Sequence, residues 1–92
     1  MAKFDIKWSE QVTNDLLQVK SFLKKVDYQK NNQFLKDLIS DITDQIENHL
    51  SDYPVTRIIS GIQLRKFICH HFAVLVATNG NAVRVLRLLN EN

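Results

Sequence analysis

The last forty residues alternate short apolar, β-branched runs with residues that favour turns. The runs occupy residues 55–60, 64–70, 72–78 and 82–89. The breaks between them are Ser60-Gly61, His70-His71 and Asn79-Gly80-Asn81. Asn-Gly is the strongest short hairpin signal, because both residues tolerate a positive φ. The pattern therefore predicts an antiparallel meander of four strands.

In the first half of the chain, the spacing of the apolar residues changes from two residues to three and four. Residues 4–8 alternate apolar and polar side chains, which is typical of a half-buried strand. Ser9 is a good N-cap for an amphipathic helix over residues 10–25, and Asp27 is expected to cap a second helix. Pro54 ends the second helix, because proline disfavours the helical conformation of the residue before it. The apolar stripe of the first helix is Val12, Leu16, Val19, Leu23 and Val26, widened by Leu17 and Phe22; that of the second is Phe34, Leu35, Leu38, Ile39, Ile42, Ile46, His49 and Leu50.

The order of elements predicts a single α+β domain over residues 1–92, β-α-α-β-β-β-β. A short connection makes the two helices an antiparallel hairpin, packed on one face of a mainly antiparallel twisted sheet. The first strand must pair with a late strand, because only the sheet can satisfy its backbone hydrogen bonds. Residues 73–77 are apolar at successive positions, so we expect both faces of the central strands to be covered, one by the helices and the other by a partner.

The chain has no motif that indicates a cofactor or a metal. There is no glycine-rich phosphate loop and no Cys-x-x-Cys pair. His70 and His71 are adjacent and would point in opposite directions on a strand, so a hairpin end is the better interpretation than a metal site. His49 is expected to be a hydrogen-bonded residue at the rim, and Cys69 a small buried hydrophobe. No signal peptide or membrane span is evident, which predicts a cytoplasmic protein without membrane contact.

Charge is distributed unevenly along the chain. Residues 1–52 hold seven lysines and nine acids, whereas residues 53–92 hold four arginines and one lysine against Glu91 alone. Any single arginine is most simply a solvated charge on a sheet edge. As a set, they predict a surface that faces an anionic target or partner, because the neutralising acids are missing and the arginine fork binds phosphate and carboxylate bidentately. The candidate binding residues are Arg57, Arg65, Lys66, Arg84 and Arg87.

Strand alternation predicts which face each arginine occupies. Arg84 and Arg87 are three residues apart, so they should point to opposite faces. One should project from the open side of the sheet, and the other should lie at the helix-covered edge and reach an acid of the second helix. The predicted groups are Arg57 with Val55 and Ile59, Arg65 with Phe67 and Cys69, Arg87 with Val83, Val85 and Leu89, and Arg84 with Ala82, Leu86 and Leu88.

Taken together, these features resemble the RelE/ParE superfamily of toxins from bacterial type II toxin-antitoxin modules. The resemblance rests on the short first strand, the helix pair, the spacing from Leu50 to Pro54, the Leu64-Arg65 strand opening and the closing run at 82–89. It implies growth inhibition, plasmid stabilization and a cognate antitoxin partner. RelE-type members cut mRNA on the ribosome with basic residues of the concave sheet and a C-terminal arginine with a tyrosine or histidine. ParE-type members inhibit DNA gyrase and lack that catalytic set.

The resemblance also supplies a candidate nuclease set of Arg57, Arg65, Lys66, His70 and His71. Arg65 matches the arginine that opens the middle strand of the nuclease branch, and a histidine could carry the proton. The sequence ends soon after the last strand, at Asn90-Glu91-Asn92, so we expect no C-terminal acid or base. This favours a ParE-like toxin that acts by binding, with DNA gyrase as the candidate target. The alternatives are a ribosome-dependent mRNA endonuclease and a degenerate interaction module. Separately, the uncovered apolar strands predict self-association, for example as a homodimer.

Overall fold

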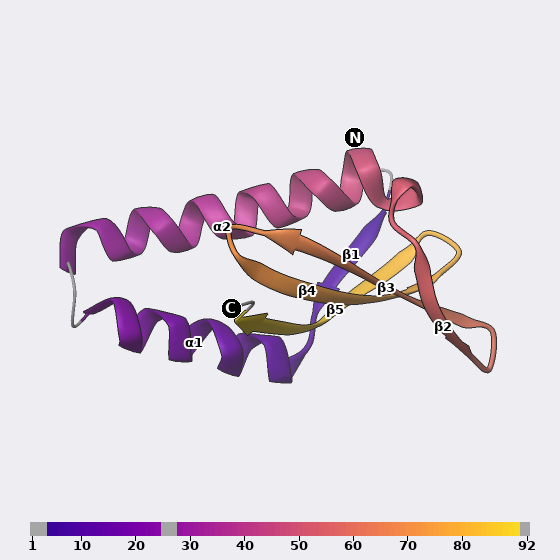
Figure 1. The fold of residues 1–92 in the computed structure, drawn as a ribbon, viewed down its shortest axis with the longest axis horizontal. Helices are drawn as coiled ribbons and strands as arrows, with labels where there is room; N and C mark the ends of the chain where they lie inside the picture. The colour runs from indigo at the N-terminus through magenta and orange to yellow at the C-terminus, as the bar shows by residue number, and fades with distance from the viewer. Residues whose placement is uncertain (1–3, 25–27, 91–92) are drawn as a thin grey trace.

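The computed structural model describes residues 4–24 and 28–90, which form two helices and five strands (Figure 1). The elements in chain order are β1 (Asp5–Trp8), α1 (Glu10–Lys24), α2 (Tyr28–His49), the short 3₁₀ helix η1 (Leu50–Asp52), β2 (Val55–Ile59), β3 (Ile62–Cys69), β4 (Phe72–Asn79) and β5 (Ala82–Asn90). This order confirms the predicted α+β class. Asp27, the expected cap of the second helix, lies outside the described residues.

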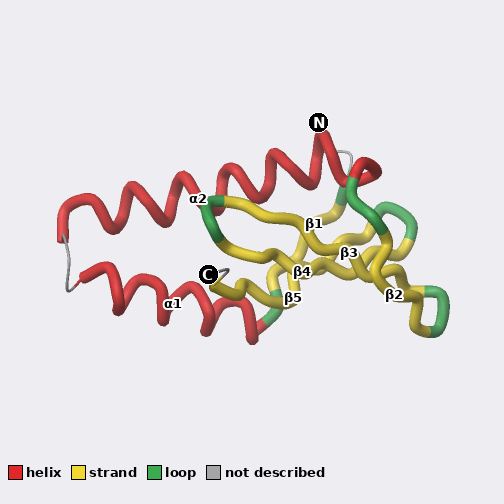
Figure 2. The backbone as a smooth tube through the Cα atoms, viewed as in Figure 1, coloured by secondary structure: helices red, strands yellow, loops and turns green. Residues whose placement is uncertain are grey.

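All five strands belong to one sheet, in the order β1-β5-β4-β3-β2. Strands β2 to β5 form the predicted antiparallel meander, and β1 pairs in parallel with β5, from Asp5 opposite Ala82 to Trp8 opposite Val85. The expectation that the first strand pairs with a late one is therefore confirmed. The two helices run antiparallel and extend past one end of the sheet, whereas the β2-β3 turn lies at the other end (Figure 2).

Ser9 joins β1 to α1 by satisfying backbone groups of both elements. Its Oγ accepts a hydrogen bond from the N–H of Val12 at 3.1 Å and donates one to the carbonyl of Leu86 at 2.9 Å. Its own N–H donates to the carbonyl of Val85 at 3.0 Å. Because the first N–H groups of a helix have no partner within the helix, this side chain fixes where α1 begins.

The core lies between the helices and one face of the sheet. From the helices, Val12 of α1 and Leu38, Ile42 and Ile46 of α2 are completely buried. They pack on Phe67, Cys69, Val74, Val76, Val83, Val85 and Leu88 of the sheet. The predicted stripe of α2 is confirmed at these positions, but the inclusion of Leu17 in the stripe of α1 was wrong, because that side chain is 58% exposed.

The three hairpin turns all use backbone conformations with positive φ. Ser60 and Gly61 have φ of 51° and 82°, and His70 and His71 have φ of 51° and 70°. Two successive positive φ values are the signature of a type I′ turn, which matches the twist of the flanking strands. In the third hairpin Asn79 pairs with Ala82, so the two-residue loop is Gly80-Asn81, one position later than the Asn-Gly signal implies. Gly80 supplies the positive φ there, at 61°.

Replacing His71 with glycine is expected to stabilise the protein by about 1 kcal/mol. A non-glycine residue in the left-handed region costs roughly 1–2 kcal/mol, part of which is offset by the greater freedom of glycine in the unfolded chain. The free energy of unfolding from urea titrations measures the effect. Gly61→Ala, in the turn at the other end of β3, is the control and should lower the free energy of unfolding. A loss of stability in His71→Gly would show that the contacts of the His71 imidazole contribute more free energy than the backbone strain costs.

Two bulges change the faces that alternation alone predicts. One extra residue, Thr56, lies between the pairs Val55–Arg65 and Arg57–Leu64, and another, Leu86, lies between Val76–Val85 and Leu75–Arg87. A bulge puts two residues opposite one, so the alternation beyond it is reversed. The predicted grouping of Arg57 with Val55, of Arg87 with Val83 and Val85, and of Arg84 with Leu88 was therefore wrong. Arg84 and Arg87 share a face instead of pointing apart.

Candidate functional site

The face of the sheet that points away from the core, here called the open face, carries most of the predicted basic residues. Its residues follow from the register, because they alternate with the core positions of each strand. They are Asp5 and Lys7 of β1, Arg57 and Ile59 of β2, Ile62, Leu64, Lys66 and Ile68 of β3, Ala73, Leu75, Ala77 and Asn79 of β4, and Ala82, Arg84, Arg87 and Leu89 of β5. Five basic side chains share this face, and the acids associated with it are Asp5 and Asp15.

One row of paired residues crosses the sheet and carries three of the charges. This basic row runs Arg57, Leu64, Ala77, Arg84 and Lys7, one residue from each strand. Adjacent strands are about 4.8 Å apart, so Lys7 and Arg84 are direct neighbours, and Arg57 lies about three strand spacings from Arg84. Arg57, Arg84 and Lys7 are exposed, and none of them forms an ion pair with a described residue. Lys7 was not predicted as a site residue, although its position in an alternating strand could have indicated it.

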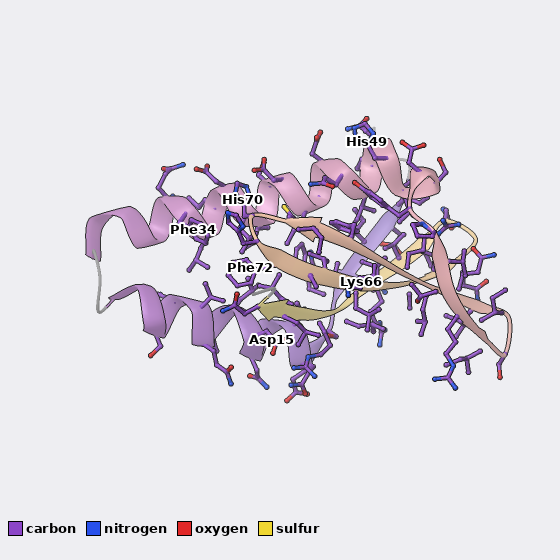
Figure 3. All side chains as sticks on the ribbon, in the orientation of Figure 1. Asp15, Phe34, His49, Lys66, His70 and Phe72 are labelled. Carbon is purple, nitrogen blue, oxygen red and sulfur yellow. The ribbon has the colours of Figure 1, made fainter. Side chains whose placement is uncertain are left out.

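Two further rows continue the open face toward the β3-β4 turn. Lys66, Leu75 and Arg87 form the second row, and Ile68, Ala73 and Leu89 form the third. Ile68 and Leu89 are 50% and 45% exposed. Figure 3 shows Lys66 on the middle of the sheet, well separated from His49 and His70. The open face is therefore basic over two rows and apolar over the third.

A shallow hollow of about 410 Å³ lies at the β1 side of the basic row. Its lining includes the cations Lys7 and Arg84, the acid Asp5, and the apolar residues Ile62, Ala77 and Leu86. The small side chain of Ala77 leaves room between the larger ones, and the two cations lie side by side at its edge. This arrangement can hold one acidic or phosphate group against Arg84 while apolar atoms pack on Leu86.

Arg87 forms an ion pair with an acid of the first helix, whereas the prediction was that one of Arg84 and Arg87 would reach an acid of the second. Its Nε donates to Oδ2 of Asp15 at 2.9 Å and its Nη2 to Oδ1 at 3.3 Å. The same carboxylate accepts the backbone N–H of Leu88 at 2.9 Å. β1 ends at Trp8, opposite Val85, so Asp15 satisfies the edge of β5 beyond that point. Arg87 is held in a defined position at the border of the open face.

Arg65 belongs to the core side of β3. It shares this side with Phe67 and Cys69, which confirms that predicted grouping. Its Nη1 donates to the carbonyl of Tyr53, and its Nη2 donates to Oε1 of Gln63 at 3.2 Å. The structure therefore separates Arg65 from Arg57, Lys66, Arg84 and Arg87, which it brings together.

His70 and His71 form the β3-β4 turn, as the sequence predicts, and both are directed toward the helices. The Nε2 of His70 contacts the carboxylate of Asp41 on α2, and its ring lies edge-on to Phe34 at 6.0 Å between centroids. His71 lines a groove with Phe34, Val19 and Asp15. The open face therefore has no imidazole beside its cations. His49 is exposed at the rim, with Nδ1 3.4 Å from Oδ2 of Asp52.

Cys69 is a free, buried cysteine, as predicted. Burial raises the pKa of its thiol above the usual 9.0, and the nearby Asp41 carboxylate raises it further, while a hydrogen bond with Gln45 lowers it. Well below pH 9 the thiol is neutral in both the folded and the unfolded chain, and as the pH rises through 9 the unfolded chain ionises first. The free energy of unfolding should therefore fall as the pH rises through and beyond 9. In Cys69→Ala the free energy of unfolding should fall less steeply with pH. If the pH dependence is the same as in the wild type, other groups cause it, such as Tyr53, whose pKa is also raised by burial.

None of the described helices combines the length and the apolar character needed to cross a membrane. Within the described residues, no three His, Cys, Asp or Glu side chains gather where they could hold a metal ion.

Comparison with known proteins identifies the fold. No family model and no curated protein matches the sequence. A chain from the chromosomal ParDE toxin-antitoxin system of P. aeruginosa is similar over 98% of both chains, with a TM-score of 0.73 and 12% identity. A chain of the archaeal RelE-RelB complex from Pyrococcus horikoshii OT3 is similar over 98% of this chain and 97% of that one, with a TM-score of 0.63 and 14% identity. The YoeB dimer from Staphylococcus aureus gives 0.53 and 13%, over 99% and 100%.

Proposed function

We propose that this chain, which has the fold of the RelE and ParE toxins, is the toxin of a toxin-antitoxin pair and inhibits growth by binding its target through the open face. The target that we propose is DNA gyrase, as in the ParE branch, and the proposed setting is the bacterial cytoplasm. The binding residues are Arg57, Lys66, Arg84, Arg87 and the added Lys7.

The distribution of the proton carriers is the observation that supports binding over cleavage. RNA cleavage needs a base, an acid and charge stabilisation at phosphorus. The basic row and Lys66 provide the charges, but His70 contacts Asp41 on the opposite side of the sheet and Arg65 contacts the carbonyl of Tyr53. The candidate nuclease set is thus divided between two faces.

A cognate antitoxin is the proposed partner, and the open face indicates its chemistry. The cations of the open face would pair with carboxylates of the partner. The exposed Ile68 and Leu89 would pack against apolar side chains that neighbour those carboxylates. We therefore propose an acidic segment with apolar anchors that lies across β3, β4 and β5. Two of the structurally similar proteins come from a ParDE system and a RelE-RelB complex, which supports a partner of this type.

Induced expression in bacteria tests the proposal. Viable counts are measured after induction of the wild type, of the open-face variant Lys66→Ala/Arg84→Ala and of the control His70→Ala/His71→Ala. Transcript ends are mapped and plasmid supercoiling is measured on the same cultures. We expect the wild type and the histidine variant to inhibit growth and reduce supercoiling, and the open-face variant to do neither.

Other outcomes separate the alternatives. Codon-periodic transcript cuts that depend on the histidines would overturn the binding mechanism in favour of a ribosome-dependent nuclease. Normal growth on induction of the folded wild-type chain would favour a degenerate interaction module. Circular dichroism of each purified variant shows that a loss of activity is not a loss of fold.

A further inference from the structure

A second basic pocket lies on the core side of the sheet, at the end opposite the histidine turn. It encloses about 350 Å³ where η1 meets the β2-β3 and β4-β5 turns. Its lining includes Ser51, Gly61, Gln63, Arg65, Thr78 and Gly80. Because Arg65 points away from the open face, this pocket is separate from the proposed target-binding site.

The guanidinium of Arg65 is held in this pocket by neutral groups. Nη1 donates to the carbonyl of Tyr53 and Nη2 to the amide oxygen of Gln63. Its Nε is fully buried and makes no hydrogen bond to a described residue. A buried donor without a partner is uncommon in folded proteins, so the residues around Arg65 leave its guanidinium incompletely satisfied.

The charge of Arg65 is not balanced by the residues around it. No described carboxylate lies within ion-pair distance of its guanidinium, and none of the residues that line the pocket is acidic. Arg87, the other partly buried arginine, has the carboxylate of Asp15 as its partner. Removing a cation from water without an opposite charge is unfavourable, so Arg65 should gain free energy from an anion.

The remaining lining is part apolar, from Phe4 and Leu50, and part polar, and the polar part suits an oxyanion. Ser51 and Asn79 provide hydroxyl and amide donors, and the side chain amide of Gln63 can donate from the same wall. The space beside the two turn glycines, Gly61 and Gly80, is open, since a methyl group built on either would meet no atom within 4 Å. A volume of about 350 Å³ is enough for one carboxylate with its attached carbon chain, near the lower end of ligand pockets.

We propose that the Arg65 pocket binds a single carboxylate, presented by an acidic side chain of a bound polypeptide or by a small free acid. The carboxylate oxygens accept from the guanidinium and from the polar lining. A purely structural role for Arg65, in which it only holds the carbonyl of Tyr53, requires no anion and predicts no response to one. This inference does not depend on the proposed toxin function.

Titrations monitored by NMR test the proposal on the full chain. The probes are sodium acetate and the blocked peptide acetyl-Gly-Glu-Gly-amide, each at constant ionic strength with chloride as the balancing anion. We expect saturable shifts of the Arg65 Nε–H signal and of the amides of Gly61 and Gly80. A dissociation constant at least threefold lower for the peptide than for acetate assigns the carboxylate to a polypeptide, and equal values assign it to a free acid.

The variant Ser51→Asp is designed to abolish anion binding, because the new carboxylate occupies the pocket in place of an added anion. The hydrogen bond from Arg65 to the carbonyl of Tyr53 is expected to remain in this variant. We expect its affinity for acetate to fall at least tenfold. Ser40→Asp, which adds the same charge at an exposed position of α2, should bind acetate like the wild type. Shifts that do not saturate, shifts confined to the open face, or equal acetate affinities in Ser51→Asp and the wild type would each overturn the proposal.

Discussion

Replacing Ile42 with alanine is expected to lower the free energy of unfolding by about 2–5 kcal/mol, as large-to-small changes in a packed core do. Ile42 is completely buried, and it lies between Leu38 and Ile46 in the part of α2 that covers the sheet. The total free energy of unfolding of a small domain is only about 5–15 kcal/mol, so this substitution could remove most of the protein's stability. Urea denaturation monitored by circular dichroism measures it.

Ile39 is the matched control, because it belongs to the same helix and has the same side chain. It is 38% exposed, so Ile39→Ala should cost well under half as much as Ile42→Ala. Equal losses at the two positions would mean that α2 packs on the sheet through a different face from the one described. The comparison therefore tests the orientation of the helix as well as the size of the core.

The second large effect is expected at Asp15. Asp15→Ala should cost about 3 kcal/mol, because it leaves the N–H of Leu88 without an acceptor and Arg87 without its carboxylate. The carboxylate is almost fully buried, at 7% exposure, so water cannot replace it easily. Arg87→Ala should cost only about 1 kcal/mol, because its side chain is 40% exposed and Asp15 still accepts from Leu88.

The ratio of these two losses identifies what Asp15 does. A larger loss for Asp15→Ala than for Arg87→Ala means that the carboxylate mainly serves the backbone of β5. Equal losses would mean that the ion pair is the whole effect and that the Leu88 hydrogen bond contributes little. Thermal and urea unfolding of the two single variants and of the double variant give the coupling between the side chains.

The order of the elements, the helix stripe of α2 and the turn positions could be predicted from the sequence, because they depend on neighbouring residues. Alternation with period two, apolar spacing of three and four, and the Ser60-Gly61 and His70-His71 breaks are all local signals. The basic character of the sheet half followed from composition. The carboxylate of Asp15 had no such signal, because its partners Arg87 and Leu88 are more than seventy residues away.

The faces of individual side chains were decided by the tertiary structure. The bulges at Thr56 and Leu86 each add one residue opposite a partner strand, and a single residue reverses the alternation beyond it. They bring Arg57, Arg84 and Arg87 onto the open face, and strand pairing adds Lys7 and leaves Arg65 on the core side. Sequence alone therefore determined that the chain has a basic sheet under a helical hairpin. The pairing register determined which charges lie together, because register depends on contacts between strands and not on the order of residues within a single strand.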